Sequence, residues 1–90
     1  MERPYVNFGA YIKSIRETTS LTQKQTSEAI GLSSKQAYNL IENGFTLLQP
    51  RYQKKFCKLF NIPESELLLR WARQVYLRDC LMSRKTKIKP

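Results

Sequence analysis

The chain has no histidine, only two cysteines and only three glycines among its 90 residues. Without histidine, a Cys/His zinc site and any catalysis that needs imidazole are excluded. Cys57 and Cys80 are too few and too far apart for a disulfide framework, so both are expected to be small core residues with free thiols. No glycine-rich phosphate loop is present. We therefore expect no enzyme, metal, cofactor or small-molecule substrate.

The sequence also lacks an apolar run of about 18 residues, which a membrane-spanning helix would need, and its N-terminus lacks a signal-peptide core. Acidic residues are few: seven Asp plus Glu stand against sixteen Lys plus Arg, for a net charge of +9. This balance favours an acidic partner, with nucleic acid first and an anionic membrane surface second. A basic surface kept only for solubility is the alternative. One cytoplasmic domain fits this length and composition.

The segment from Leu21 to Ile30 predicts a short helix that begins with a capping box. The Thr22 hydroxyl can accept from the backbone three residues later, where Gln25 can return the bond. Gly31 follows and suits the left-handed conformation at a helix end. The apolar side of this helix is expected to consist of Thr26, Ala29 and Ile30.

A second short helix should follow the turn and stop at Asn43–Gly44, which completes a helix-turn-helix pattern. The sequence allows two registers for this helix, which differ in the residue that caps it. With Ser34 as the cap, the inward residues are Tyr38 and Ile41, and the outward ones are Lys35, Gln36 and Asn39. With Ser33 as the cap, Gln36 closes a capping box, and the buried residues are Ala37 and Leu40. Lys35 and Asn39 are expected to be exposed in both registers.

Three further helices are expected around this pair. The first is capped by Asn7 and carries Phe8, Ile12 and Ile15 at helical spacing. After a loop at 45–49 that should partly pack down, a helix begins at Pro50, ends near Asn61 and turns Phe56, Leu59 and Phe60 inward. The last runs from Pro63 to about Met82, longer than a small domain needs. A basic, disordered tail is expected at 84–90.

In order and spacing, these pieces resemble the lambda-repressor-like, Cro/C1-type (XRE) helix-turn-helix domains of phage repressors and bacterial regulators. The resemblance is carried by Leu21-Thr22-Gln23, Gly31-Leu32-Ser33, Ile41-Glu42-Asn43-Gly44 and Leu59-Phe60-Asn61-Ile62-Pro63. It implies an all-α, compact five-helix bundle with an extended C-terminal helix. The spacing from Gly31 to Gly44 is one residue longer than the family pattern.

The resemblance also implies roles for individual residues. Arg16 would pair with Glu42, and Gln23 would hold a DNA phosphate. The candidates for reading bases in the major groove are Ser34, Lys35, Gln36 and Asn39. Further phosphate contacts are expected from Lys24, Thr46, Arg51, Lys54 and Lys55. The wide apolar surface of the last helix, and not the resemblance, gives the candidates for dimerisation, which are Trp71, Val75, Leu81 and Met82. The alternative is that Leu67, Leu68 and Trp71 complete the core and the rest of that helix frays.

The predicted organisation is an N-terminal arm at 1–6, a helix-turn-helix domain at 7–68, a dimerising extension at 69–83 and the tail at 84–90. The predicted function is sequence-specific transcriptional regulation, as a dimeric repressor on a palindromic operator, encoded by a bacterium, phage or other mobile element and associated with the nucleoid. The alternative is an antitoxin-like interaction module with a toxin or anti-repressor as its partner. A non-specific binder driven by charge is a third possibility.

Overall fold

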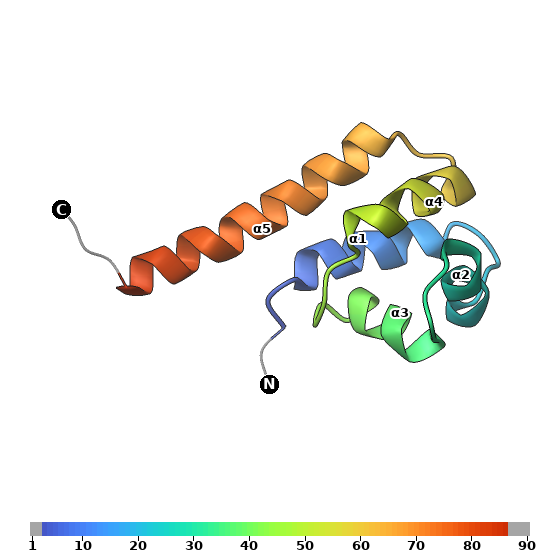
Figure 1. Ribbon diagram of the computed structural model, residues 1–90, viewed down its shortest axis with the longest axis horizontal. Helices are drawn as coiled ribbons and strands as arrows, with labels where there is room; N and C mark the ends of the chain where they lie inside the picture. Colours follow the sequence, from blue (N-terminus) through green and yellow to red (C-terminus); the bar gives the residue numbers. More distant parts are fainter. Residues whose placement is uncertain (1–2, 87–90) are drawn as a thin grey trace.

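The structure is a computed structural model that describes residues 3–86, with side chains as far as Tyr76. Within these residues the chain forms five helices and no strand, which confirms the predicted all-α class. The helices are α1 (Val6–Arg16), α2 (Gln23–Ile30), α3 (Lys35–Glu42), α4 (Pro50–Phe60) and α5 (Glu64–Thr86). Helices α1 to α4 cluster at one end, and α5 runs along α1 and then beyond the bundle (Figure 1).

The core lies where the first four helices and the first turns of α5 meet. Every helix contributes to it, and the loop before α4 adds Leu48, which is fully buried as the predicted packing of that loop requires. The buried apolar residues are Phe8, Ile12, Ile30, Tyr38, Ile41, Leu48, Phe56, Cys57 and Leu67. Cys57 is therefore a core residue with a free thiol, as predicted. The side chain of Cys80 lies outside the part of the chain that the structure describes.

Several helix ends differ from the sequence-based expectation. The cap of α1 is Tyr5, two residues before Asn7, and its side chain makes no capping hydrogen bond. Asn61 ends α4 in the left-handed conformation, as its predicted position implies. Helix α5 continues to Thr86, so the predicted tail is wrong for residues 84–86. No helix breaker interrupts the chain there, which allows the helix to continue.

Two side chains predicted to face the core are exposed. Ala29 lies on the outer side of α2, and Leu59 on α4 is 37% exposed. In both helices the buried positions instead include a polar or small residue: Ser27 in α2 and Gln53 in α4. Each of these polar groups bonds a backbone carbonyl, of Lys24 and of Leu48 respectively, which makes its burial tolerable.

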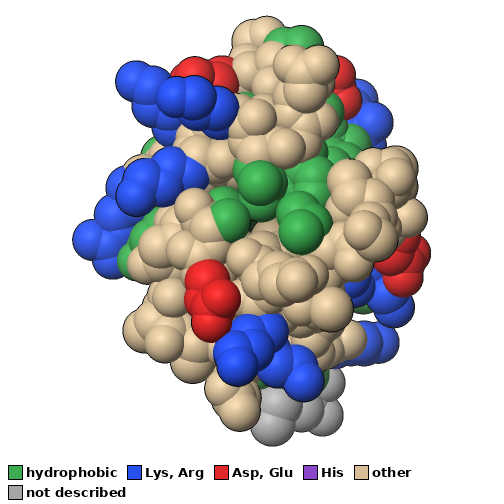
Figure 2. Space-filling view, turned by 90° about the vertical axis from the view of Figure 1, so that its right-hand side faces the viewer, with side chains coloured by type: hydrophobic (Ala, Val, Ile, Leu, Met, Phe, Trp, Pro, Cys, Tyr) green, Lys and Arg blue, Asp and Glu red, His purple; other side chains and the backbone are tan. Residues whose placement is uncertain are grey.

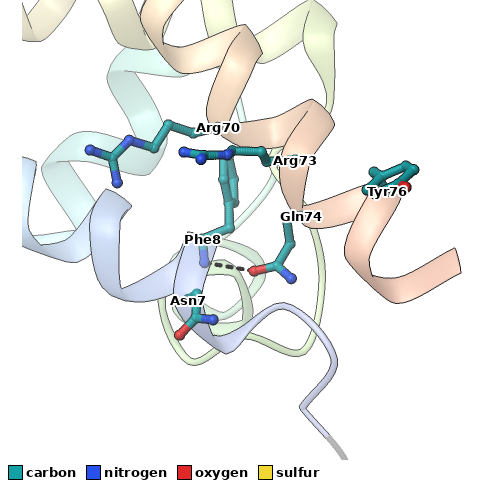
Figure 3. A pocket seen from close by; sticks show the side chains of 6 residues that line it. All are labelled: Asn7, Phe8, Arg70, Arg73, Gln74 and Tyr76. Atoms are coloured by element: carbon teal, nitrogen blue, oxygen red, sulfur yellow. Dashed lines mark hydrogen bonds between the residues drawn. The ribbon is translucent and has the colours of Figure 1, made fainter. Parts of the chain in front are cut away.

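Helix α5 supplies the cap that α1 lacks. The Gln74 side-chain oxygen accepts from the backbone N–H of Phe8 at 2.9 Å (Figure 3). The amide nitrogen of the same side chain donates to the Pro4 carbonyl at 3.4 Å. Gln74 is buried. A helix start leaves unpaired backbone donors, which a side-chain oxygen normally satisfies locally. Here the oxygen comes from 66 residues away, so the docking of α5 and the start of α1 depend on each other.

A second pair of contacts holds α5 against α1 further along the two helices. The Tyr11 hydroxyl donates to the Glu66 carboxylate at 2.6 Å, and the Arg70 guanidinium lies 4.1 Å from the centre of the Tyr11 ring. Burial, with the Glu66 bond, raises the pKa of Tyr11 to about 12. Tyr11 is therefore neutral at physiological pH and can serve as the donor of this bond.

At Gly9 the backbone of α1 lies close to the end of α3. A Cβ at this position would lie 2.5 Å from the Ile41 carbonyl oxygen and 2.7 Å from that of Glu42. Glycine in a helix interior costs about 1 kcal/mol relative to alanine. The close approach of the two backbones explains why a glycine stands here, and it sets how near the end of α3 can lie to α1.

Candidate nucleic-acid interface

The turn between α2 and α3 has the geometry of a helix-turn-helix. Thr22 and Gln25 form the predicted capping box, with bonds of 3.1 and 2.9 Å, and Gly31 ends α2 in the left-handed conformation at φ 86°. The Ser34 hydroxyl then accepts from the backbone N–H of Ala37 at 3.1 Å and so caps α3. Of the two predicted registers, the one with Ser34 as the cap is present.

This register decides which side chains of α3 face outward. Tyr38, Ile41 and Glu42 are buried, whereas Ser34 is half-buried at the cap. The exposed residues of α3 are Lys35, Gln36 and Leu40. Two of them follow the predicted pattern; Leu40 was expected to be buried only in the other register, and it was not predicted to be part of the site.

Asn39 is half-buried, so the prediction that it is exposed is wrong. Its amide donates to the Gln23 side-chain oxygen at 3.2 Å, and its own oxygen accepts from the Asn43 amide at 3.0 Å. Both ends of this side chain therefore have protein partners. The helical spacing places Asn39 toward the edge of the exposed face, but it could not reveal the amides of Gln23 and Asn43 beside it.

These bonds belong to a longer chain of polar contacts that we call the Glu42 network, formed by Arg16, Gln23, Asn39, Glu42 and Asn43. Arg16 and Glu42 form the predicted ion pair with two bonds, of 2.6 and 3.2 Å. Gln23 donates to the same carboxylate at 2.9 Å. The network joins α1, α2 and α3 behind the exposed face of α3, so it fixes the orientation of that helix.

The charged forms of Glu42 and Arg16 stabilise each other in this network. Burial alone would raise the pKa of Glu42, but the bonds from Arg16 and Gln23 more than offset it and hold that pKa below its ordinary value. The bond to Glu42 in turn raises the pKa of Arg16. The Tyr38 side chain is fully buried, and this burial, with the charge of Glu42, raises the pKa of its phenol well above the ordinary value. The pair is thus charged at neutral pH, and the phenol is neutral.

Gln23 is held more firmly than a free phosphate ligand would be. Its amide nitrogen donates to Glu42, and its oxygen accepts from Asn39. The amide nitrogen carries a second hydrogen that these bonds do not use. Gln23 can therefore present one donor outward while the network fixes its direction.

A shallow cavity of about 350 Å³ lies where α2, the turn and the start of α3 meet. Lys24 and Glu28 border it from α2, and Lys35 and Gln36 from α3. Ser33 and Ser34 add hydroxyl groups between the two helices. Polar donors and a positive helix end thus converge on one concave surface, which suits an anionic group such as a phosphate.

The other predicted phosphate ligands are on the surface. Thr46, Arg51, Lys54 and Lys55 are exposed. Arg51 lies over the Tyr52 ring at 4.9 Å. The Lys55 ammonium group approaches to 3.6 Å from where a Cβ on Gly31 would be, so it lies beside the turn. In the view onto the right-hand end of Figure 1, basic side chains stand along the upper left edge and again at the lower centre and the lower right, with acidic side chains between them (Figure 2).

Of the four predicted dimerisation residues, the structure describes the side chains of Trp71 and Val75. Trp71 is half-buried and packs against the core, and Val75 is half-buried as well. The side chains of Leu81 and Met82 are outside the described part of the chain. The large apolar side chains that α5 exposes, as far as its side chains are described, are Leu68, Leu69 and Tyr76, at 49%, 61% and 68%.

The described residues contain no group of three or more Cys, Asp or Glu side chains that could hold a metal ion. Their helices include none long and apolar enough to cross a membrane.

Comparison with known protein families also identifies a helix-turn-helix domain. A family model described as "Helix-turn-helix domain" matches residues 7–69, more than half of the chain. The match includes the capping box, the turn, α3 and the Glu42 network. Searches of curated proteins and of solved structures found no significant match. The chain belongs to the helix-turn-helix domain family.

Proposed function

We propose that this protein is a sequence-specific DNA-binding transcriptional regulator of the Cro/C1 type that places α3 in the major groove. The observation that carries the proposal is the exposed face of α3. It presents Lys35 and Gln36 in the first turn of a helix that the Glu42 network holds rigidly from behind. A recognition helix contacts base edges mainly through its N-terminal residues. Rigid support makes such contacts selective.

The two polar side chains on this face have different chemistry. Gln36 can bond the edge of an adenine in two places, and Lys35 can donate to the acceptors of guanine. Ser34 is occupied as the cap of α3. Asn39 is oriented by Gln23 and Asn43 and, like Gln23, keeps one amide hydrogen, but it is half-buried, so base reading is assigned first to the exposed Lys35 and Gln36.

The surrounding groups supply affinity without sequence choice. Gln23 offers its remaining amide hydrogen, and Lys24 and Lys55 stand beside the turn. Each Lys or Arg that contacts a phosphate releases a condensed cation, which makes binding depend steeply on salt. Thr46, Arg51 and Lys54 complete the proposed set.

We further propose that the protein acts as a homodimeric repressor on a palindromic operator of a phage or other mobile element. Support comes from α5, which extends beyond the bundle and exposes Leu68, Leu69 and Tyr76. Tyr76 follows Leu69 by seven residues and Leu68 by eight, which is two turns of helix, so the three lie toward one side of α5. A symmetric pair of copies would offer two recognition helices about 34 Å apart, one turn of DNA.

The test is selection of bound sites from random duplex DNA by the full chain at a low and a moderate salt concentration. We expect one motif to be enriched at both, with two copies related by a dyad. Steep loss of binding with salt and no enriched motif would replace the proposal with a charge-driven, non-specific binder. Enrichment of a single half-site without a dyad would support base reading by α3 but would contradict binding to a palindromic operator.

A further inference from the structure

The third exposed residue of α3 is a leucine. Leu40 is 42% exposed, and it is four residues after Gln36, so the two side chains stand on the same side of the helix one turn apart. The separation along the axis is about 6 Å. The exposed face of α3 is therefore polar in its first turn and apolar in its second.

The position of Leu40 is fixed by its backbone. Its carbonyl accepts from the N–H groups of Phe45 at 2.9 Å and Thr46 at 3.4 Å, which closes the end of α3 onto the following loop. The nearest polar side chains on the same part of the helix, Asn39 and Asn43, bond each other. A single exposed leucine needs no explanation on an ordinary surface, but this one lies in a fixed position on the face proposed to enter DNA.

The chemistry of the groove narrows what Leu40 can contact there. A leucine can bond neither phosphates nor the polar edges of bases. The apolar group that the major groove displays is the C5-methyl of thymine. Burying a methyl group against an aliphatic side chain removes both from water, and this contributes a selectivity of roughly fourfold for each methyl.

We propose that Leu40 is a specificity-determining residue that reads the methyl group of a thymine, an inference that rests on the proposed DNA-binding function. The thymine lies within about two base pairs of the pair contacted by Gln36, because the rise of about 6 Å from Gln36 to Leu40 spans about two base-pair steps of about 3.4 Å. The half-site is thus read by hydrogen bonds at one end of α3 and by a methyl contact at the other.

The test uses the site selected from random DNA and replaces each thymine in turn with deoxyuridine, which removes only the methyl group. We expect the unaltered protein to lose about fourfold in affinity at one position in each half-site. The variant Leu40→Ala should bind the thymine site about tenfold more weakly and should no longer distinguish thymine from deoxyuridine at that position. Alanine is a good helix former, so the exposed substitution preserves the fold.

Leu59→Ala is the matched control, since Leu59 is 37% exposed and lies on α4. It should keep the full preference for thymine. If no deoxyuridine substitution weakens binding, or if Leu40→Ala retains the same preference, the role of Leu40 is overturned while selective DNA binding stands. If selection enriches no motif at all, the proposed function fails first and the methyl contact fails with it.

Discussion

At the residue scale, the Glu42 carboxylate joins three helices, because Arg16 comes from α1, Gln23 from α2 and Glu42 itself from α3. Only 1% of the Glu42 side chain is exposed, against 14% of Arg16. An ion pair on an open surface contributes at most about 1 kcal/mol. Breaking a buried pair costs more, because the remaining charge loses its partner without regaining water.

We expect Glu42→Gln to lower the free energy of unfolding by about 2–3 kcal/mol at pH 7, since it leaves the Arg16 guanidinium without a charged partner. The folded-state pKa of Glu42 lies below its ordinary 4.5. Its contribution is therefore fully present above about pH 5 and is lost as the pH falls through the folded-state value. Urea denaturation of both proteins from pH 7 to 3 measures this. A difference that stays constant or widens toward pH 3 would contradict it.

A second residue-scale prediction concerns Lys35. Lys35→Ala should weaken binding to the selected site and, if the lysine donates to guanine, relax the preference at one base pair. Loss of a phosphate contact alone would weaken all sequences alike and reduce the salt slope by about one. Arg73→Ala, on α5 across α1 from α3, removes the same charge and should change neither (Figure 1). Unchanged affinity of Lys35→Ala would remove this residue from the interface.

Much of the site could be predicted at this scale, and the parts that could not have a common cause. The capping box and the Arg16–Glu42 pair follow from local spacing or from family resemblance. The cap at Ser34 and the exposure of Leu40 depend instead on the register of α3, and the burial of Asn39 depends on which side chains of α2 lie beside it. The extra residue in the turn left that register open, and only tertiary packing decides it.

At the scale of elements, the cap that Gln74 gives to α1 makes a specific prediction. Gln74→Ala removes the acceptor for the Phe8 N–H and leaves a buried donor unpaired, so it should cost about 1–2 kcal/mol of stability. Gln74→Glu keeps an acceptor at the positive end of the helix and should cost less. Thermal unfolding of the two variants measures the difference. Equal losses would show that packing, rather than the cap, is the role of Gln74.

Gly9 makes a prediction about the distance between α1 and α3. In Gly9→Ala the new Cβ would meet two carbonyl oxygens of α3, so the helices must separate. Crowding of this kind costs about 1–3 kcal/mol, which exceeds the gain in helix propensity. We also expect weaker DNA binding at temperatures where the variant is folded. Ser14→Ala, at an exposed position of the same helix, is the control. A stabilised Gly9→Ala would refute the close approach.

The sequence contained no signal for either contact between elements. Gln74 is a polar residue in a helix, which periodicity assigns to the surface, and the Phe8 donor that it satisfies is 66 residues away. The sequence does not reveal the contact at Gly9 either, since a glycine within a predicted helix usually only weakens the prediction of that helix. Helix positions follow from local pattern, whereas the partner of each helix end follows from the assembled bundle.

At the scale of the whole molecule, the long axis of 50 Å reflects α5, which continues past the bundle. If its exposed apolar residues join two copies, the double variant Leu69→Glu, Tyr76→Glu should sediment with half the mass of the unaltered protein. Like charges would face each other across the dyad. It should also bind the full operator no more tightly than a half-site. An unchanged mass would exclude this surface as the dimer contact. The variant Lys58→Glu on α4 is the control for added acidic charge, and its mass should not change.

The Gln74 contact also sets how short a working fragment can be. The family match ends at residue 69, but the side chain that completes the start of α1 comes five residues later. A gene fragment cut at the family boundary would lose both Gln74 and Trp71, which packs against the core. Engineered fusions that borrow this DNA-binding unit should therefore be joined beyond Gln74.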